Sequence, residues 1–252
     1  MKHVHFWATS FRGGSPPIVM PHTIRRHAMT DFNWRFRIPL DRLDSIRHEA
    51  PFVQMVALGR ALNSLRFLQL AFLQYDDSDH PPASRQRFAA VFFMAAVLHE
   101  GIKLLKRMGQ HFRTTRTWQE SITPIFRDRL VERLFDDSIA PLRTGVVFHF
   151  MEKSVQSVLA QSIFDEIVLI SGAGPQQGNV HYDFSDLLAF VLFTGVTTSA
   201  DEHLANAKTL LTRTLDVLTQ FIEAAESLAT EYCVNEGFLR EVRDANGNWY
   251  AA

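Results

Sequence analysis

Residues 83–111 read ASRQRFAAVFFMAAVLHEGIKLLKRMGQH, and this stretch predicts a long helix at the centre of the protein. Its apolar side chains recur three and four positions apart, which is the repeat of one face of an α-helix. That face comprises Phe88, Val91, Phe92, Ala95, Leu98, Ile102, Leu105 and Met108. Because the first half of the stretch is apolar nearly all round, we expect other helices to surround it.

The same helical spacing continues on both sides of this stretch. Apolar residues between 43 and 72 predict helical structure with a break or restart at Pro51, whereas residues 75–82 predict a loop. Pro124 begins a shorter helix, and Pro141 lies in the first turn of the next one, where proline is well tolerated.

The C-terminal third is also predicted to be helical. A short apolar helix is expected near residues 184–193, and a long one over residues 199–232, where Ser199 and Glu202 have the spacing of a capping box. The only strand signal is a weak one over residues 167–170. The sequence therefore predicts an all-α fold, a bundle of about five to seven helices with a long C-terminal helix.

The first 28 residues differ in composition and pattern from the rest of the chain. Residues 1–28 contain glycine and proline without any apolar periodicity, and we predict that they form a flexible N-terminal tail. Residues 29–252 are predicted to form a single helical domain, with its C-terminal helices in residues 180–236.

Composition favours a globular protein in a reducing compartment. Hydrophobic residues make up 46% of the chain and charged residues 21%, which argues against disorder. Cys233 is the only cysteine, so no intramolecular disulfide can form, and we expect a cytoplasmic location. The longest apolar runs, residues 88–98 and 187–196, are shorter than the roughly 20 residues that cross a bilayer, so no membrane partner is expected.

The net charge of −1 conceals an uneven distribution. Residues 1–120 hold 17 of the 26 Lys and Arg residues but nine of the 27 Asp and Glu residues, so a basic face could meet an anionic partner or another copy of the chain. Lys103, Lys106 and Arg107 lie three and four positions apart and share one helix face. They are candidates for binding a phosphate backbone, while the commoner alternative is a solvated face that pairs with acidic residues elsewhere.

Several motifs do not meet the requirements of the sites that they resemble. Residues 167–178 resemble a strand entering a glycine-rich phosphate loop, but no helix signal follows at once. His99-Glu100 lacks a second histidine at the metalloprotease spacing, where Lys103 stands instead.

A second group of polar residues, His181, Asp183 and Asp186, could ligate a metal, but such groups are common in solvated loops. We therefore expect neither a metal site nor a cofactor.

The remaining candidate is LRTGVVFHF, residues 142–150, in which Arg143 and His149 lie six positions apart. On a regular helix six steps turn about 600°, so the two side chains converge only if the backbone is irregular or a partner chain completes the site. An Arg can bind a phosphate and stabilise the charge of a phosphorane. A His can take the proton of a ribose 2′-OH or give one to the leaving oxygen.

This string resembles the Arg-x4–6-His motif of the HEPN superfamily, helical domains of toxins, phage-defence proteins and RNA-processing factors. The resemblance covers residues 40–165. It implies metal-independent RNA cleavage through 2′-OH attack, with a 2′,3′-cyclic phosphate product and a site usually formed across a homodimer. Arg143 and His149 match the motif residues, whereas Thr144 stands where the family commonly has Asn, Asp or His.

Two hypotheses follow from these observations. In the first, the protein is a HEPN-like endoribonuclease, a toxin or defence effector that acts as a homodimer and has an antitoxin or another protein as partner. Arg143, His149 and Thr144 would be catalytic, and Lys103 with its two basic neighbours would bind RNA. In the second, the protein is a non-catalytic helical module that binds RNA or protein, and its acidic C-terminal helix mediates association.

Overall fold

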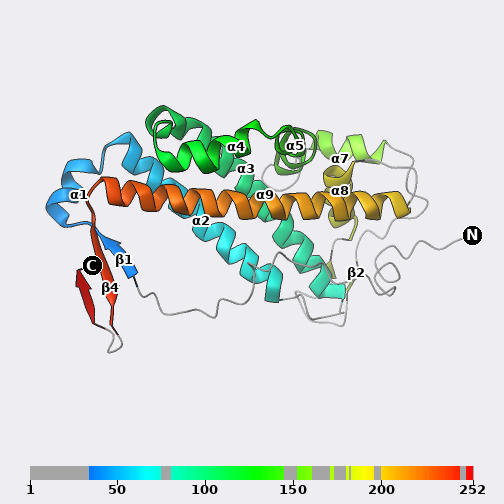
Figure 1. The fold of residues 1–252 in the computed structure, drawn as a ribbon. Coiled ribbons are helices and arrows are strands. Elements are labelled where there is room, and N and C mark those ends of the chain that lie inside the picture. Colours follow the sequence, from blue (N-terminus) through cyan, green and yellow to red (C-terminus); the bar gives the residue numbers. More distant parts are fainter. Residues whose placement is uncertain are drawn as a thin grey trace, which may run out of the picture.

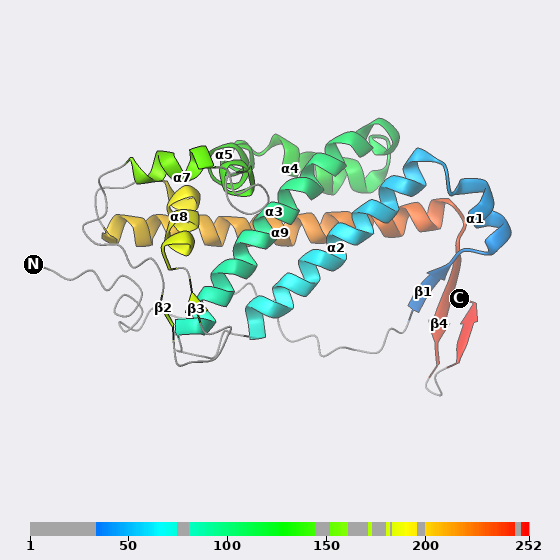
Figure 2. The ribbon, with the colours of Figure 1, turned by 180° about the vertical axis from the view of Figure 1, so that it is seen from behind.

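Three long helices dominate the computed structural model, which describes residues 34–74, 81–144, 152–160, 171–172, 180–181, 183–195, 200–244 and 248–251. They are α2 (Ala50–Gln74), α3 (Pro81–Phe112) and α9 (Ala200–Asn235). Helices α2 and α3 form an antiparallel pair that lies side by side against one face of α9 (Figures 1 and 2). The predicted all-α bundle with a long C-terminal helix is confirmed.

Shorter helical segments cover another side of α9. They are π-helical η2 (Trp118–Ile122), α4 (Thr123–Arg127), α5 (Arg129–Leu134), π-helical η3 (Phe135–Ile139), α6 (Ala140–Leu142), α7 (Glu152–Leu159) and α8 (Asp183–Thr194). Figure 1 shows α4, α5 and α7 in a row along the upper side of α9. The helix expected after Pro124 is interrupted at Asp128, whose side chain accepts a hydrogen bond from the Leu130 N–H and so starts α5 as a new helix.

Two helix boundaries depend on proline. The expected restart at Pro51 is confirmed, because α1 (Leu40–Ile46) ends before α2 begins at Ala50. The predicted loop over residues 75–82 extended too far, because residues 81 and 82 already belong to α3, which begins at Pro81. Proline in a first helical turn removes an N–H that would have no helical partner, so neither proline disrupts its helix.

The core joins the N-terminal and C-terminal helices. Its largest fully buried side chains include Leu58 and Leu65 of α2, Leu98 and Leu105 of α3, and Phe221 of α9. Helices α3 and α9 approach closely at Gly101, where a Cβ atom would lie 2.5 Å from the Phe221 ring. The helices from residues 40–144 and from residues 200–235 therefore share one hydrophobic core.

Some of the basic residues in the N-terminal half form ion pairs with acidic residues in the C-terminal half. Arg42 lies 3.0 Å from Glu236, and Arg66 forms an ion pair with Glu226 of α9. Basic residues of the N-terminal half thus pair with acidic residues of the C-terminal helix. Because these pairs are exposed, each contributes less than about 1 kcal/mol.

A small sheet, which sequence analysis did not predict, lies beside the C-terminal end of α9. It comprises β1 (Trp34–Arg37), β4 (Leu239–Arg243) and β5 (Trp249–Ala251), antiparallel in the order β1-β4-β5. Within it Glu241 is buried, 2.7 Å from Arg35 and 3.4 Å from Arg37. A two-residue ladder joins β2 (Ser171–Gly172) to β3 (Val180–His181).

Strand β1 escaped prediction because four residues are too few to establish an alternating pattern. Its partner β4 lies about 200 positions away, and the burial of Glu241 depends on that pairing. The strand expected over residues 167–170, the tail at residues 1–28 and Ser199 of the capping box lie outside the described residues.

Tyr232 offers a test of core packing. It is buried in edge-to-face contact with Phe112 and Phe238, and its hydroxyl has no hydrogen-bond partner among the described residues. Burial raises the pKa of Tyr232 to about 12. We expect Tyr232→Phe to keep or raise the free energy of unfolding, by up to about 1 kcal/mol, because it removes an unsatisfied polar group. Urea unfolding measures this change, and a loss above about 1 kcal/mol would mean that the hydroxyl is bonded.

Candidate functional site around Arg143

Arg143 directly follows α6 and, like Thr144, has π-helical backbone in the helical run that begins with α5. Ile139 and Leu142 on this run are fully buried in the core, and they hold the segment before Arg143 against α3. The Arg143 side chain is 22% exposed, and its Nη2 lies 2.9 Å from Oε1 of Glu100 on α3. Packing of apolar residues therefore brings an Arg and a Glu together although they lie 43 positions apart in the sequence.

Glu100 is the centre of this polar cluster. The same carboxylate oxygen lies 3.3 Å from His99 Nδ1 and 4.0 Å from Lys103 Nζ. Because Glu100 is 45% exposed, water screens these interactions and each adds little to stability. Their effect is geometric: the carboxylate fixes where the Arg143 guanidinium lies beside Lys103.

His99 occupies the buried side of the cluster. Its ring stacks on Phe135 of η3, with a centroid distance of 5.9 Å. Burial lowers the pKa of His99, as do the nearby charges of Lys103 and Arg143, although contact with Glu100 opposes this shift. His99 is therefore neutral near pH 7. A carboxylate only accepts hydrogen bonds, so neutral His99 donates from Nδ1 to Glu100.

The lowered pKa of His99 predicts a pH dependence of stability. Between the unfolded value, about 6.5, and the lower folded value, the unfolded chain binds a proton that the folded chain does not. The free energy of unfolding contributed by His99 therefore falls as the pH drops below about 6.5. We expect His99→Phe to lose less stability than the wild type between about pH 7.5 and pH 5.5, as measured by thermal unfolding. Equal losses in the two proteins would contradict this account of His99.

The residues predicted to act with Arg143 are only partly described. Lys103, Lys106 and Arg107 have exposed side chains on one face of α3, and Lys103 is linked to Arg143 through Glu100. Thr144 follows Arg143 and is half-buried. His149 lies outside the described residues, so its place relative to Arg143 stays a prediction.

The part that His99 and Glu100 play is not evident from the sequence. Together they match only half of a metalloprotease motif. The available signal was that an apolar central helix carries two adjacent polar residues, which require partners when they are buried. Nothing in the sequence indicated that Arg143 would be the partner.

The described residues were compared with the requirements of a metal site and of a membrane-spanning helix. No group of three or more His, Cys, Asp or Glu side chains lies together there as a metal site would require, and the side chains of His181, Asp183 and Asp186 are not described. None of the described helices is both long and apolar enough to cross a membrane.

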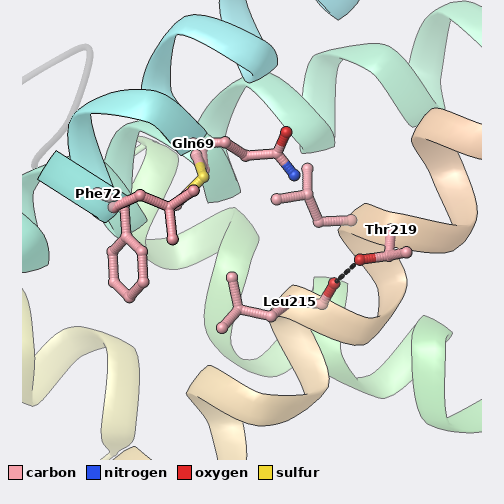
Figure 3. Close-up of a pocket in the computed structure, with 7 residues that line it drawn as sticks. Gln69, Phe72, Leu215 and Thr219 are labelled. Atoms are coloured by element: carbon pink, nitrogen blue, oxygen red, sulfur yellow. Dashed lines mark hydrogen bonds between the residues drawn. The ribbon is translucent and has the colours of Figure 1, made fainter. Parts of the chain in front are cut away.

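A small pocket lies away from the polar cluster, between α2, α3 and α9 (Figure 3). Figure 3 shows Gln69 and Phe72 of α2 facing Leu215 and Thr219 of α9, where the Thr219 hydroxyl donates to the Leu215 carbonyl. The free space is about 10 Å³, close to the room that one water molecule needs. It is a packing defect between mostly apolar side chains and is too small for an organic ligand.

Comparison with protein-family models, curated proteins and solved structures finds no match to this chain.

Proposed function

We propose that the protein is a HEPN-like, metal-independent endoribonuclease in which Arg143 binds the scissile phosphate. The observation that supports this proposal is the fixed position of the Arg143 guanidinium, which Glu100 holds beside Lys103 at the edge of the core. A guanidinium carries five N–H groups, so a carboxylate can orient it while other N–H groups bind phosphate oxygens.

In the proposed reaction the ribose 2′-oxygen forms a bond to phosphorus, and the bond from phosphorus to the 5′-oxygen breaks. The products are a 2′,3′-cyclic phosphate and a 5′-hydroxyl. Arg143 stabilises the negative charge of the phosphorane, and His149 removes the 2′-OH proton or supplies the proton of the leaving oxygen. Glu100 acts as a positioning residue through Arg143, and Thr144 helps to orient the site.

The exposed Lys103, Lys106 and Arg107 provide the proposed path for the RNA strand. They lie on consecutive turns of α3, next to the Glu100 that holds Arg143. Phosphate contacts of this kind are electrostatic, so binding should weaken as the salt concentration rises. On this proposal the protein is a cytoplasmic toxin or defence effector, with an antitoxin or another protein as its regulator.

The test is cleavage of cellular RNA by purified protein in excess EDTA. We expect the wild type to cleave and to leave cyclic-phosphate ends, His149→Ala to be inactive, and His48→Ala, at an exposed histidine after α1, to cleave normally. Equal activity of wild type and His149→Ala would exclude the proposed role of His149.

The alternative, a helical interaction module, is favoured by a different observation. The apolar stripe of α9, expected to mediate association, includes Leu215, Leu218 and Leu228, which are buried in the core of the chain itself. Helix α2, in contrast, exposes large apolar side chains to solvent. If the protein is such an interaction module, it binds its partner through α2 rather than through α9.

A further inference from the structure

The outer face of α2 exposes large apolar side chains. Val53, Val56, Phe67 and Leu70 are between 50% and 70% exposed. Figure 2 shows α2 in front of α9, with no described helix or strand lying over its outer side. Such a row of apolar residues on a helix is typical of an interaction surface.

The spacing of this row is that of a coiled-coil seam. Positions 53, 56, 60, 63, 67 and 70 alternate by three and four, like the a and d positions of a heptad. The two middle positions are Arg60 and Asn63, both with exposed side chains. These six residues are called the outer seam below. Leu58 and Leu65, which are fully buried, lie on the opposite side of the helix.

The outer seam is also symmetric about its own midpoint, between positions 61 and 62. When an antiparallel copy of α2 is laid on it, Val53 faces Leu70 and Val56 faces Phe67. In the middle Arg60 faces Asn63, whose amide oxygen can accept from a guanidinium. Each apolar residue thus meets an apolar residue and each polar one a polar one, so the seam is complementary to itself in a two-fold interface.

We propose that the outer seam of α2 binds the outer seam of a second copy of this chain, antiparallel and about a two-fold axis near positions 61 and 62. Helix α2 contains no acidic residue, and Arg60 forms no ion pair within the part of the chain that is described. In the pair each Arg60 can donate to the Asn63 amide oxygen of the second copy while its charged head stays in water, which keeps the two Arg60 cations apart.

Small residues beside the seam permit close approach in this arrangement. Ala57 and Gly59 lie beside its N-terminal half, and a Cβ atom on Gly59 would meet nothing of the same chain within 4 Å. The dimer does not depend on the proposed chemistry, because α2 can associate whether or not Arg143 is catalytic.

Light scattering after size-exclusion chromatography tests the surface. The wild type should be dimeric at micromolar concentration. Phe67→Lys should raise the dissociation constant on the order of 100-fold, because each dimer loses both of its apolar contacts between Phe67 and Val56. Leu130→Lys, at an exposed leucine of α5, is the matched control and should leave the constant unchanged. A monomeric wild type, or a Phe67→Lys protein that dimerises as tightly, would overturn the proposal.

Crosslinking tests the orientation, with Cys233→Ser as the background. Val56→Cys and Phe67→Cys proteins should be joined by a short bismaleimide only when the two are mixed. In an antiparallel pair residue 56 lies opposite residue 67, whereas identical positions lie about 16 Å apart along the helices. Crosslinking of either variant with itself would indicate a parallel pair and overturn the antiparallel arrangement.

Discussion

Arg143→Ala is expected to cleave RNA roughly 1,000-fold more slowly than the wild type, because it removes the charge that stabilises the phosphorane. The variant should still fold. The Arg143 side chain is largely buried and its partner Glu100 is half-exposed, so we expect loss of this charged contact to lower the free energy of unfolding by about 1–3 kcal/mol. Cleavage rates and thermal unfolding, measured on the same preparation, separate the loss of activity from a loss of structure.

Glu100→Gln should have a smaller effect on the same reaction. The amide keeps the shape of the side chain but not the charge that orients Arg143, so we expect kcat to fall on the order of 10- to 100-fold with KM little changed. Glu100→Asp, which keeps the charge, should restore part of the rate. These readouts distinguish a positioning residue from a residue that only supports the fold.

Arg116 and Glu120 provide a matched control pair. They form an exposed ion pair at 2.9 Å, remote in sequence from Arg143. Arg116→Ala should cleave RNA at the wild-type rate. If Arg143→Ala and Arg116→Ala had equal activity, Arg143 would have no part in the chemistry.

Gly101→Ala is expected to destabilise the fold by about 1–3 kcal/mol, the opposite of what an alanine usually does in a helix. Gly101 lies within α3, where alanine is normally better than glycine by about 1 kcal/mol. Here the added Cβ would lie 2.5 Å from the ring of Phe221, which is fully buried on α9. Either the ring or the helix must move, and the close packing of α3 on α9 would be lost.

Gly59→Ala is the control for this prediction. Gly59 lies within α2 and nothing in the same chain stands within 4 Å of an added Cβ, so the variant should gain about 0.5–1 kcal/mol when it is measured at a concentration at which the chain is monomeric. The two free energies of unfolding, from urea denaturation, should therefore have opposite signs relative to the wild type. A Gly101→Ala protein that is stabilised as much as Gly59→Ala would show that α3 and α9 do not approach so closely.

The long helices could be predicted because their signal is local and repeated. The stripe through Leu98 and Leu105 recurs over many turns, and each turn confirms the same face. Strand β4, with five residues, is too short for a pattern to repeat in this way. Its central Glu241 would be an unfavourable residue to bury if Arg35 and Arg37 did not pair with it across β1.

The candidate site could be predicted only in part for the same reason. Arg143 and Lys103 were selected for the chemistry of their side chains, which the sequence gives directly. The ion pair between Arg143 and Glu100 depends on how η3 and α6 pack against α3. Such a tertiary contact leaves no local pattern, so the sequence around His99 and Glu100 matches only a different, incomplete motif.

The central claim, that this protein cleaves RNA by 2′-OH attack without a metal, is tested most directly with one pair of oligonucleotides. Wild-type protein in excess EDTA is incubated with an RNA cut in the cellular assay and with the DNA of the same sequence. We expect the RNA to be cut with a 2′,3′-cyclic phosphate end and the DNA to remain intact, because the DNA lacks the attacking hydroxyl. Cleavage of both strands, or RNA ends without a cyclic phosphate, would contradict the proposed mechanism.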